Sequence, residues 1–502
     1  MGLVGCGMWD LSFPPGPPDR VADMFTAAVV ADAVRRFDAD LAQSVETCRD
    51  WRRDYRRVFR GLTALAVTAP SVSLGIAQEG LESTRTMLRF AAGRTVTSLR
   101  AVDVREAADD AELATGRVDG EAEPVRRLEV PYRGETLAGD ALRRQLGQWR
   151  DHGIVEPGFA AAVERVIDHP EWLALPGFRL TAVGATAHLG PVRSLLSWGA
   201  QVLAVDRPGR ARWDRLYAAA RAGAGTLRFP VTESGPGVDL TRHFPALARW
   251  ITEHADIRPV LGLYANLPGA AGIRLSAASD VLAEAVLRDR PDTALAYLGA
   301  STDCYAVPPA VVEEARDRLA HRGFQGKAQD LVHRAVSGSL YRPNYEHPVR
   351  EADGARWDLF DNLPTLLGPD YALAQRLPRW RAVLARAAGH TVSYTVTPPA
   401  WPTDIRESPW RPTALRGADH YGIEVFDRAT IRPLLAAKLV ADLFAPDEPD
   451  PNPDALFTKG AAHGGLWRQP FHPQSLIAPS TLLGGLDAVR DFGARGIRRY
   501  FG

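Results

Sequence analysis

Lysine and cysteine are scarce in this sequence of 502 residues. Only three of its 60 basic residues are lysines, Lys327, Lys438 and Lys459, so few lysines are available for a catalytic role. The three cysteines are odd in number and widely separated. They offer neither a disulfide framework nor a paired zinc spacing. We therefore expect reduced thiols and no metal site.

An excess of one charge and long apolar runs are also missing. The 60 acidic residues balance the 60 basic ones, so nothing favours nucleic acid or an anionic membrane surface as a partner. The sequence contains no run of about 18 apolar residues that would predict a membrane span. Its first residues lack the basic region of a secretory signal. We expect a cytoplasmic protein that acts on a small molecule, with a homo-oligomer left open.

The first third of the chain has helical periodicity. Between residues 21 and 115, apolar residues recur at spacings of three and four with charges between them, a pattern typical of amphipathic helices. A short strand and further helices follow, up to the punctuation at Pro176 and Gly177. We predict an N-terminal, mainly helical domain over residues 1–176.

From residue 177 to 445, short apolar strands alternate with helices. The predicted strands are 179–185, 200–206, 225–231, 258–266, 293–301 and 390–399. Such alternation predicts an α/β fold, a doubly wound parallel sheet with helices on both faces. The pattern is interrupted by an insertion at about 310–365. The tail, 446–502, is expected to be loop-rich or to act as a lid.

A glycine-containing turn, "GATAHLG", follows the first predicted strand from Gly184 to Gly190. Glycines permit a tight turn and a close approach of a pyrophosphate. Asp206 ends the second strand, where a carboxylate can bind the adenosine ribose, and so slightly favours NAD. Arg207 follows it and suits a 2′-phosphate, which keeps NADP open. A plain turn and a helix-capping aspartate are the alternatives without a ligand.

The order of these features resembles the short-chain dehydrogenase/reductase family over roughly half the chain. His188 stands at the middle glycine of that family's phosphate loop, and Asp239 in "VDLT" stands at its adenine-contacting aspartate. Asn266 in "LYANLPGAAG" stands at its Asn-Asn-Ala-Gly segment. Ser301 in "LGASTD" and Tyr371, which opens the next long helix, stand at its catalytic serine and tyrosine.

The resemblance implies a Rossmann fold and an NAD(P)-dependent oxidoreductase that acts on a hydroxyl or carbonyl group. Ser301 would position the substrate oxygen, and Tyr371 would exchange a proton with it. A tyrosine has a pKa near 10 and needs a nearby cation to work near neutrality. The family's lysine supplies that charge, but Gln375 stands in its place here. A glutamine can hydrogen-bond a ribose but is neutral.

Three departures from the family pattern keep alternatives open. Gln375 is neutral, and the His188 side chain would crowd a pyrophosphate, hydrogen-bond it or plug the site. Pro378 lies inside the tyrosine helix and predicts a kink. Arg376 and Arg379 are candidates to restore a positive charge. The alternatives are a non-redox enzyme, such as a dehydratase, isomerase or cyclase, and a binding protein without turnover.

Two further segments are candidates for roles near the site. The glycine-rich "KGAAHGGLWR", with His463 and Trp467, is a candidate lid, because such loops can fold over ligands. Asp303, just after the fifth predicted strand, is a candidate additional carboxylate, with a capping role as its alternative.

Overall fold

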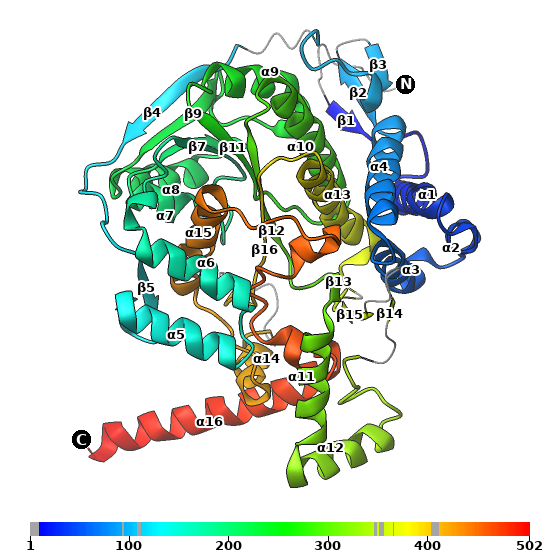
Figure 1. The fold of residues 1–502 in the computed structure, drawn as a ribbon, viewed down its shortest axis with the longest axis vertical. Helices are drawn as coiled ribbons and strands as arrows, with labels where there is room; N and C mark the ends of the chain where they lie inside the picture. The colour runs from blue at the N-terminus through cyan, green and yellow to red at the C-terminus, as the bar shows by residue number, and fades with distance from the viewer. Residues whose placement is uncertain are drawn as a thin grey trace.

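An eight-stranded sheet forms the centre of the protein in the computed structural model (Figure 1). The structure describes residues 10–92, 95–107, 112–345, 349–350, 356–364, 366–402 and 411–501. Six strands of the sheet are parallel: β7 (Phe178–Val183), β8 (Gln201–Val205), β9 (Thr226–Thr232), β11 (Arg258–Leu263), β12 (Ala294–Gly299) and β16 (Val392–Val396). They coincide with the six predicted strands, which confirms the predicted parallel α/β sheet.

The strand order places a switch point between β7 and β11. In space the strands follow the order β9-β8-β7-β11-β12-β16, so the chain builds outward from β7 on one side and then from β11 on the other. This is the 3-2-1-4-5-6 order of doubly wound sheets, which bind ligands in the crevice where the order reverses. β4 (Ala114–Asp119) and the short β10 (Gly235–Pro236) pair antiparallel with β9.

Each face of the sheet is covered by helices and has its own hydrophobic core. Along β12, Leu295 packs into one core while Ala294 and Ala296 pack into the other, because successive side chains of a strand point to opposite faces. One face carries α9 (Leu240–Glu253), α10 (Gly269–Asp289) and α13 (Gly368–Ala387). The other face carries α7 (Val192–Ser197), α8 (Arg210–Arg221) and α15 (Arg428–Phe444).

Residues before 177, expected to form one helical domain, divide between the two faces. The first group packs beside α13 and extends its core (Figure 1): α1 (Val21–Arg35), α2 (Ala39–Glu46), α3 (Trp51–Ala66) and α4 (Pro70–Met87). A small antiparallel sheet borders them: β1 (Asp10–Ser12), β2 (Arg89–Ala92) and β3 (Thr95–Ser98). The second group joins the core beneath α15: β5 (Glu129–Tyr132), β6 (Glu135–Ala138), α5 (Gly139–Asp151) and α6 (Pro157–Asp168).

α13 continues as one helix through Pro378, and the structure explains why the expected kink does not interrupt it. Proline has no N–H, so Pro378 leaves the carbonyl of Ala374 without its helical donor. The Ser276 hydroxyl of α10 donates to this carbonyl at 2.9 Å. A neighbouring helix therefore satisfies the backbone acceptor that the proline frees.

The predicted insertion is a folded unit that begins as early as Cys304. It contains a small antiparallel sheet and two helices: β13 (Cys304–Val307), β14 (Val349–Arg350), β15 (Arg356–Asp361), α11 (Pro309–Ala320) and α12 (Gly323–Ala335).

The tail is irregular, with 3₁₀ turns, only as far as Leu476, and then forms α16 (Ile477–Phe501). This helix packs closely on α14 (Arg411–Ala418), where a Cβ at Gly417 would lie 1.9 Å from the carbonyl of Ser480. Among the described residues, no helix combines the length and the hydropathy needed to cross a bilayer.

Candidate functional site

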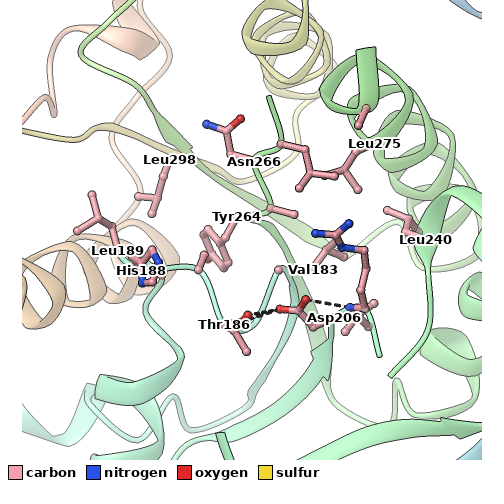
Figure 2. Close-up of a pocket in the computed structure, with 18 of the residues that line it drawn as sticks. Val183, Thr186, His188, Leu189, Asp206, Leu240, Tyr264, Asn266, Leu275 and Leu298 are labelled. Carbon is pink, nitrogen blue, oxygen red and sulfur yellow. Dashed lines mark hydrogen bonds between the residues drawn. The ribbon is translucent and has the colours of Figure 1, made fainter. Parts of the chain in front are cut away.

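A cleft of about 500 Å³ opens at the carboxyl ends of β7, β8, β11 and β12, at the switch point (Figure 2). Its volume falls within the usual range for small-molecule sites. All seven residues that the sequence assigns to cofactor binding line this cleft: Gly184, His188, Gly190, Asp206, Arg207, Asp239 and Asn266. The topology thus brings together Gly184 and Asn266, which are 82 positions apart in the chain.

The loop after β7 approaches β11 so closely that only glycine fits at its first position. Gly184 has a φ of +81°, and a Cβ there would lie 2.4 Å from the amide nitrogen of Ala265. Its own amide donates to the carbonyl of Val205 at 2.8 Å. The helix that follows, α7, has only six residues, and Pro191 before it has no N–H. This helix therefore contributes little positive potential to the loop.

Asp206 fastens this loop to the end of β8. One carboxylate oxygen accepts from the Thr186 amide at 3.0 Å and from the Thr186 hydroxyl at 2.6 Å (Figure 2). The other oxygen accepts from the Arg207 amide at 2.8 Å, and Arg212 lies 3.5 Å away. The side chain of Asp206 remains 11% exposed. Its Oδ2 already accepts two hydrogen bonds, whereas Oδ1 accepts one from an amide and keeps acceptor capacity for a further donor. Thr186 was not singled out from the sequence, although it lies in the loop.

Two further residues at the cleft have local structural partners. Asp239 caps α9 by accepting from the Thr241 amide at 3.0 Å and from the Thr241 hydroxyl at 2.8 Å. The amide oxygen of Asn266 accepts from Gln375 Nε2 at 3.4 Å. Gln375 is the only one of the three expected catalytic residues that lines the cleft.

Ser301 and Tyr371 are not brought to the cleft as a catalytic pair. Tyr371 is only 6% exposed, and its hydroxyl is hydrogen-bonded to the hydroxyl of Thr302 at 2.7 Å. Ser301 offers its backbone carbonyl to the amide side chain of Asn362 at 2.9 Å. The hydroxyl partner of the tyrosine is thus the next residue, Thr302. Both residues lie beyond the end of β12, so the packing of this loop decides which hydroxyl faces Tyr371.

The surroundings of Tyr371 oppose ionisation of its phenol. Burial raises the pKa of Tyr371 well above its usual value; the hydrogen bond with Thr302 lowers it by less, and the charge of Asp303 raises it further. Arg376 and Arg379 do not supply the expected positive charge. Arg376 Nη2 lies 3.2 Å from Asp303 Oδ1, and Arg379 Nη1 lies 3.0 Å from Asp303 Oδ2.

Asp303 is a structural anchor, not an exposed carboxylate at the site. It is 1% exposed, and it joins α13 to the start of β13 through the two arginines. The guanidinium of Arg379 also lies over the rings of Tyr305 and Phe457, at 4.5 and 4.4 Å from their centroids. A buried carboxylate between two arginines satisfies charges that would otherwise be costly in the interior.

The expected lid segment lies in the interior. His463 is fully buried, with Nε2 2.9 Å from Glu156 Oε1 and its ring stacked on Trp467 at 4.5 Å. Arg468 pairs with the same glutamate at 2.8 Å. None of these residues lines the cleft, so the segment fixes the tail to α6 and does not close over a ligand.

His188 stands at the edge of the cleft nearest to α15 (Figure 2). Its carbonyl accepts from Arg432 Nε at 2.7 Å. Burial lowers the pKa of His188, and the charges of Arg428, Arg432, Arg215 and Arg193 lower it further. The imidazole is therefore neutral at pH 7. No sequence pattern connects these arginines with the loop, because they come from three different helices.

No protein-family model matches the chain, and no curated protein matches it. Within the described ranges, no group of three or more histidine, cysteine, aspartate or glutamate side chains is arranged to hold a metal ion.

Proposed function

We propose that this protein binds an adenine dinucleotide, NAD or NADP, in the cleft at the switch point. The observation that carries the proposal is the pairing of the tight glycine turn after β7 with Asp206 at the end of β8, held together through Thr186. Doubly wound sheets use these two positions for the pyrophosphate and the adenosine ribose.

The residues present fit such a ligand at its adenosine end. Oδ1 of Asp206 retains acceptor capacity for a ribose hydroxyl, and this favours NAD. Arg207 and Arg212 flank it and suit a 2′-phosphate, which keeps NADP open. Leu240 and Leu275 offer apolar contacts for an adenine. At the other end, Asn266 and Gln375 offer amide groups to a nicotinamide riboside.

The resemblance to the short-chain dehydrogenase/reductase family adds an oxidoreductase activity on a hydroxyl or carbonyl group, in which the bound nicotinamide would exchange a hydride. The residues of this chain do not favour the proton transfer that accompanies it. The Tyr371 hydroxyl is buried and bonded to Thr302, and its nearest arginines are committed to Asp303. We therefore propose dinucleotide binding without tyrosine-mediated acid–base chemistry, as in a non-redox enzyme or a binding protein on this fold.

Titration with NAD⁺, NADH, NADP⁺ and NADPH, followed by nicotinamide fluorescence and by calorimetry, tests the proposal. We expect micromolar binding of at least one form. Asp206→Ala should weaken it at least tenfold, because it removes a carboxylate from the ribose site and releases the loop. Asp140→Ala is the matched control, since the side chain of Asp140 is 92% exposed on α5. The proposal is wrong if none of the four forms binds.

A further inference from the structure

Four arginines lie near His188, outside the cleft itself. Arg193 comes from α7, Arg215 from α8, and Arg428 and Arg432 lie one turn apart in α15. Arg432 is fixed there by its hydrogen bond to the carbonyl of His188. The charges of all four lower the pKa of His188, although Arg193 and Arg215 are exposed.

The positive charge of this cluster is not neutralised by acidic side chains of the described residues. None of the four arginines forms an ion pair with a carboxylate there, whereas the buried Arg376 and Arg379 share Asp303. Nη1 of Arg428 is buried and has no hydrogen-bond partner in the described part of the chain. Burial lowers the pKa of Arg428 and of Arg432, and neighbouring arginines lower both further. The free protein thus holds partly desolvated like charges together, at a cost in stability.

Arg193 and Arg432 also line a hollow of about 340 Å³ between α7 and α15, beside the His188 edge. The carboxylate in this hollow, Glu129, lies 2.7 Å from Arg127 and is paired with it. The hollow therefore carries uncompensated positive charge. The short helix α7, which begins after Pro191, contributes little positive potential near His188. The arginine side chains supply positive charge there instead.

We infer that Arg193 and Arg432, with Arg428 one turn away on α15, form a binding site for a phosphate group in the hollow between α7 and α15, beside His188. Guanidinium groups present planar pairs of donors that match phosphate oxygens, and an anion in the hollow would relieve the repulsion between the arginines. The phosphate has two candidate sources: the pyrophosphate of the dinucleotide proposed above, or a phosphorylated second ligand. The first source rests on the proposed function, and the second does not.

Calorimetric titration with inorganic pyrophosphate and with ADP-ribose tests the inference. Each ligand is added to the wild type, to Arg428→Gln and to the control Arg144→Gln, which removes the same charge from an exposed position on α5. We expect Arg428→Gln to weaken pyrophosphate binding about tenfold or more, with Arg144→Gln like the wild type. The inference is overturned if Arg428→Gln binds both ligands as tightly as the control does, or if pyrophosphate at millimolar concentration does not bind the wild type.

Competition separates the two sources. If the site holds the pyrophosphate of a dinucleotide, ADP-ribose displaces inorganic pyrophosphate and loses affinity in Arg428→Gln. If the site holds a second ligand, pyrophosphate binds to protein already saturated with ADP-ribose. Pyrophosphate binding without any binding of the four dinucleotide forms supports this site and contradicts the proposed function. Dinucleotide binding that is unaffected in Arg428→Gln, without an Arg428-dependent pyrophosphate site, supports the proposed function and contradicts this site.

The unfolding temperature of the ligand-free Arg428→Gln variant distinguishes a repelling arginine from a merely structural one. Loss of a structural arginine would lower this temperature. Without ligand, Arg428→Gln should unfold at a higher temperature than the wild type, because it removes a repelling, partly buried charge. Added pyrophosphate should raise the unfolding temperature of the wild type more than that of the variant, since a ligand stabilises in proportion to its occupancy. A lower unfolding temperature for the ligand-free variant would contradict the repulsion on which the inference rests.

Discussion

The two ends of the cleft differ in how their residues are held. At the end that holds Asp206 and Asp239, the two carboxylates accept hydrogen bonds from neighbouring backbone and hydroxyl groups, and both residues line the cleft. At the other end, Tyr371 turns its hydroxyl into the protein toward Thr302, and Gln375 is the only one of the three expected catalytic residues that lines the cleft. The Asp206 end keeps acceptor capacity for a ligand, whereas the Tyr371 hydroxyl is engaged within the protein.

The difference shows what strand topology does and does not determine. The carboxyl ends of parallel strands meet at one edge, so residues that directly follow these strands come together whatever packs around them. Tyr371 lies instead on a helix, and its environment depends on α3 and on the buried Asp303. The direction of a hydroxyl group and the partner of a charge are set by this packing.

The largest expected effect tests whether the charges near Tyr371 are truly committed to structure. Asp303→Asn keeps the shape of the side chain but leaves Arg376 and Arg379 buried without a counter-charge. We expect a loss of about 3–5 kcal/mol in the free energy of unfolding, measured by urea denaturation. Asp140→Asn, at an exposed position, should change it by less than about 0.5 kcal/mol. If Asp303→Asn is as stable as this control, the arginines are not held by Asp303 and are free to act on Tyr371.

The next effect concerns the Asp206 end. Thr186→Val removes the hydroxyl that donates to Asp206 but keeps the shape of the side chain and the amide donor. We expect dinucleotide affinity to fall about five- to tenfold, because the loop and the carboxylate are no longer held in register. The matched control is Thr252→Val, whose hydroxyl donates only within its own helix, to the carbonyl of Ala248. Equal affinities in the two variants would show that Thr186 does not organise the site.

A smaller effect is expected from a double-mutant cycle at the tyrosine end. Tyr371→Phe, Thr302→Val and the double variant should reveal a coupling of about 1 kcal/mol in the free energy of unfolding, because the two hydroxyls bond to each other. Dinucleotide affinity should stay within about twofold of the wild type in all three. A tenfold loss of affinity in Tyr371→Phe alone would mean that this hydroxyl reaches the ligand.

The sequence was sufficient for the sheet and for one end of the cleft. Each strand is a short apolar run bounded by turns, and the strands alternate with helices, so local patterns carry the information. The glycine turn and Asp206 directly follow two neighbouring strands, so the sheet topology alone brings them together. The division of residues 1–176 between two faces was not predictable, because amphipathic helices show which side is buried but not against which surface.

The choice of Thr302 over Ser301 and the arginine cluster at His188 depend on tertiary packing. Both hydroxyl residues lie beyond the end of β12, so the packing of this loop decides which one faces Tyr371. Arg193 and Arg428 are separated by more than 230 residues, and no local pattern links them. Helical spacing did indicate that Arg376 lies off the face of Tyr371, but only packing shows its partner to be Asp303.

The affinity for ADP-ribose is expected to change a few-fold with pH, and this change tests whether an anion binds beside His188. His188 faces Arg193 and Arg215 on α7 and α8 and Arg428 and Arg432 on α15, and these charges together with burial lower its pKa in the free protein. A bound pyrophosphate would raise that pKa by adding negative charge. The complex then takes up a proton, so the affinity for ADP-ribose should rise as the pH falls from 8 to 6. His188→Asn should flatten this dependence, and an equal slope in both proteins would place the anion away from His188.

The smallest expected change is the most informative for the tyrosine end. Gln375→Lys places a cation one helical turn from Tyr371, on the same face, where the short-chain dehydrogenase/reductase pattern that the sequence resembles has a lysine. We expect no carbonyl reduction by NADH or NADPH in this variant, because the phenol remains buried and bonded to Thr302, and the added amine cannot turn it toward the cleft. Gln375→Met controls for loss of the contact with Asn266. If Gln375→Lys alone gains carbonyl reductase activity, the Tyr371 hydroxyl already reaches a bound substrate. The two ends of the cleft would then differ by a single missing charge and not by the direction of a side chain.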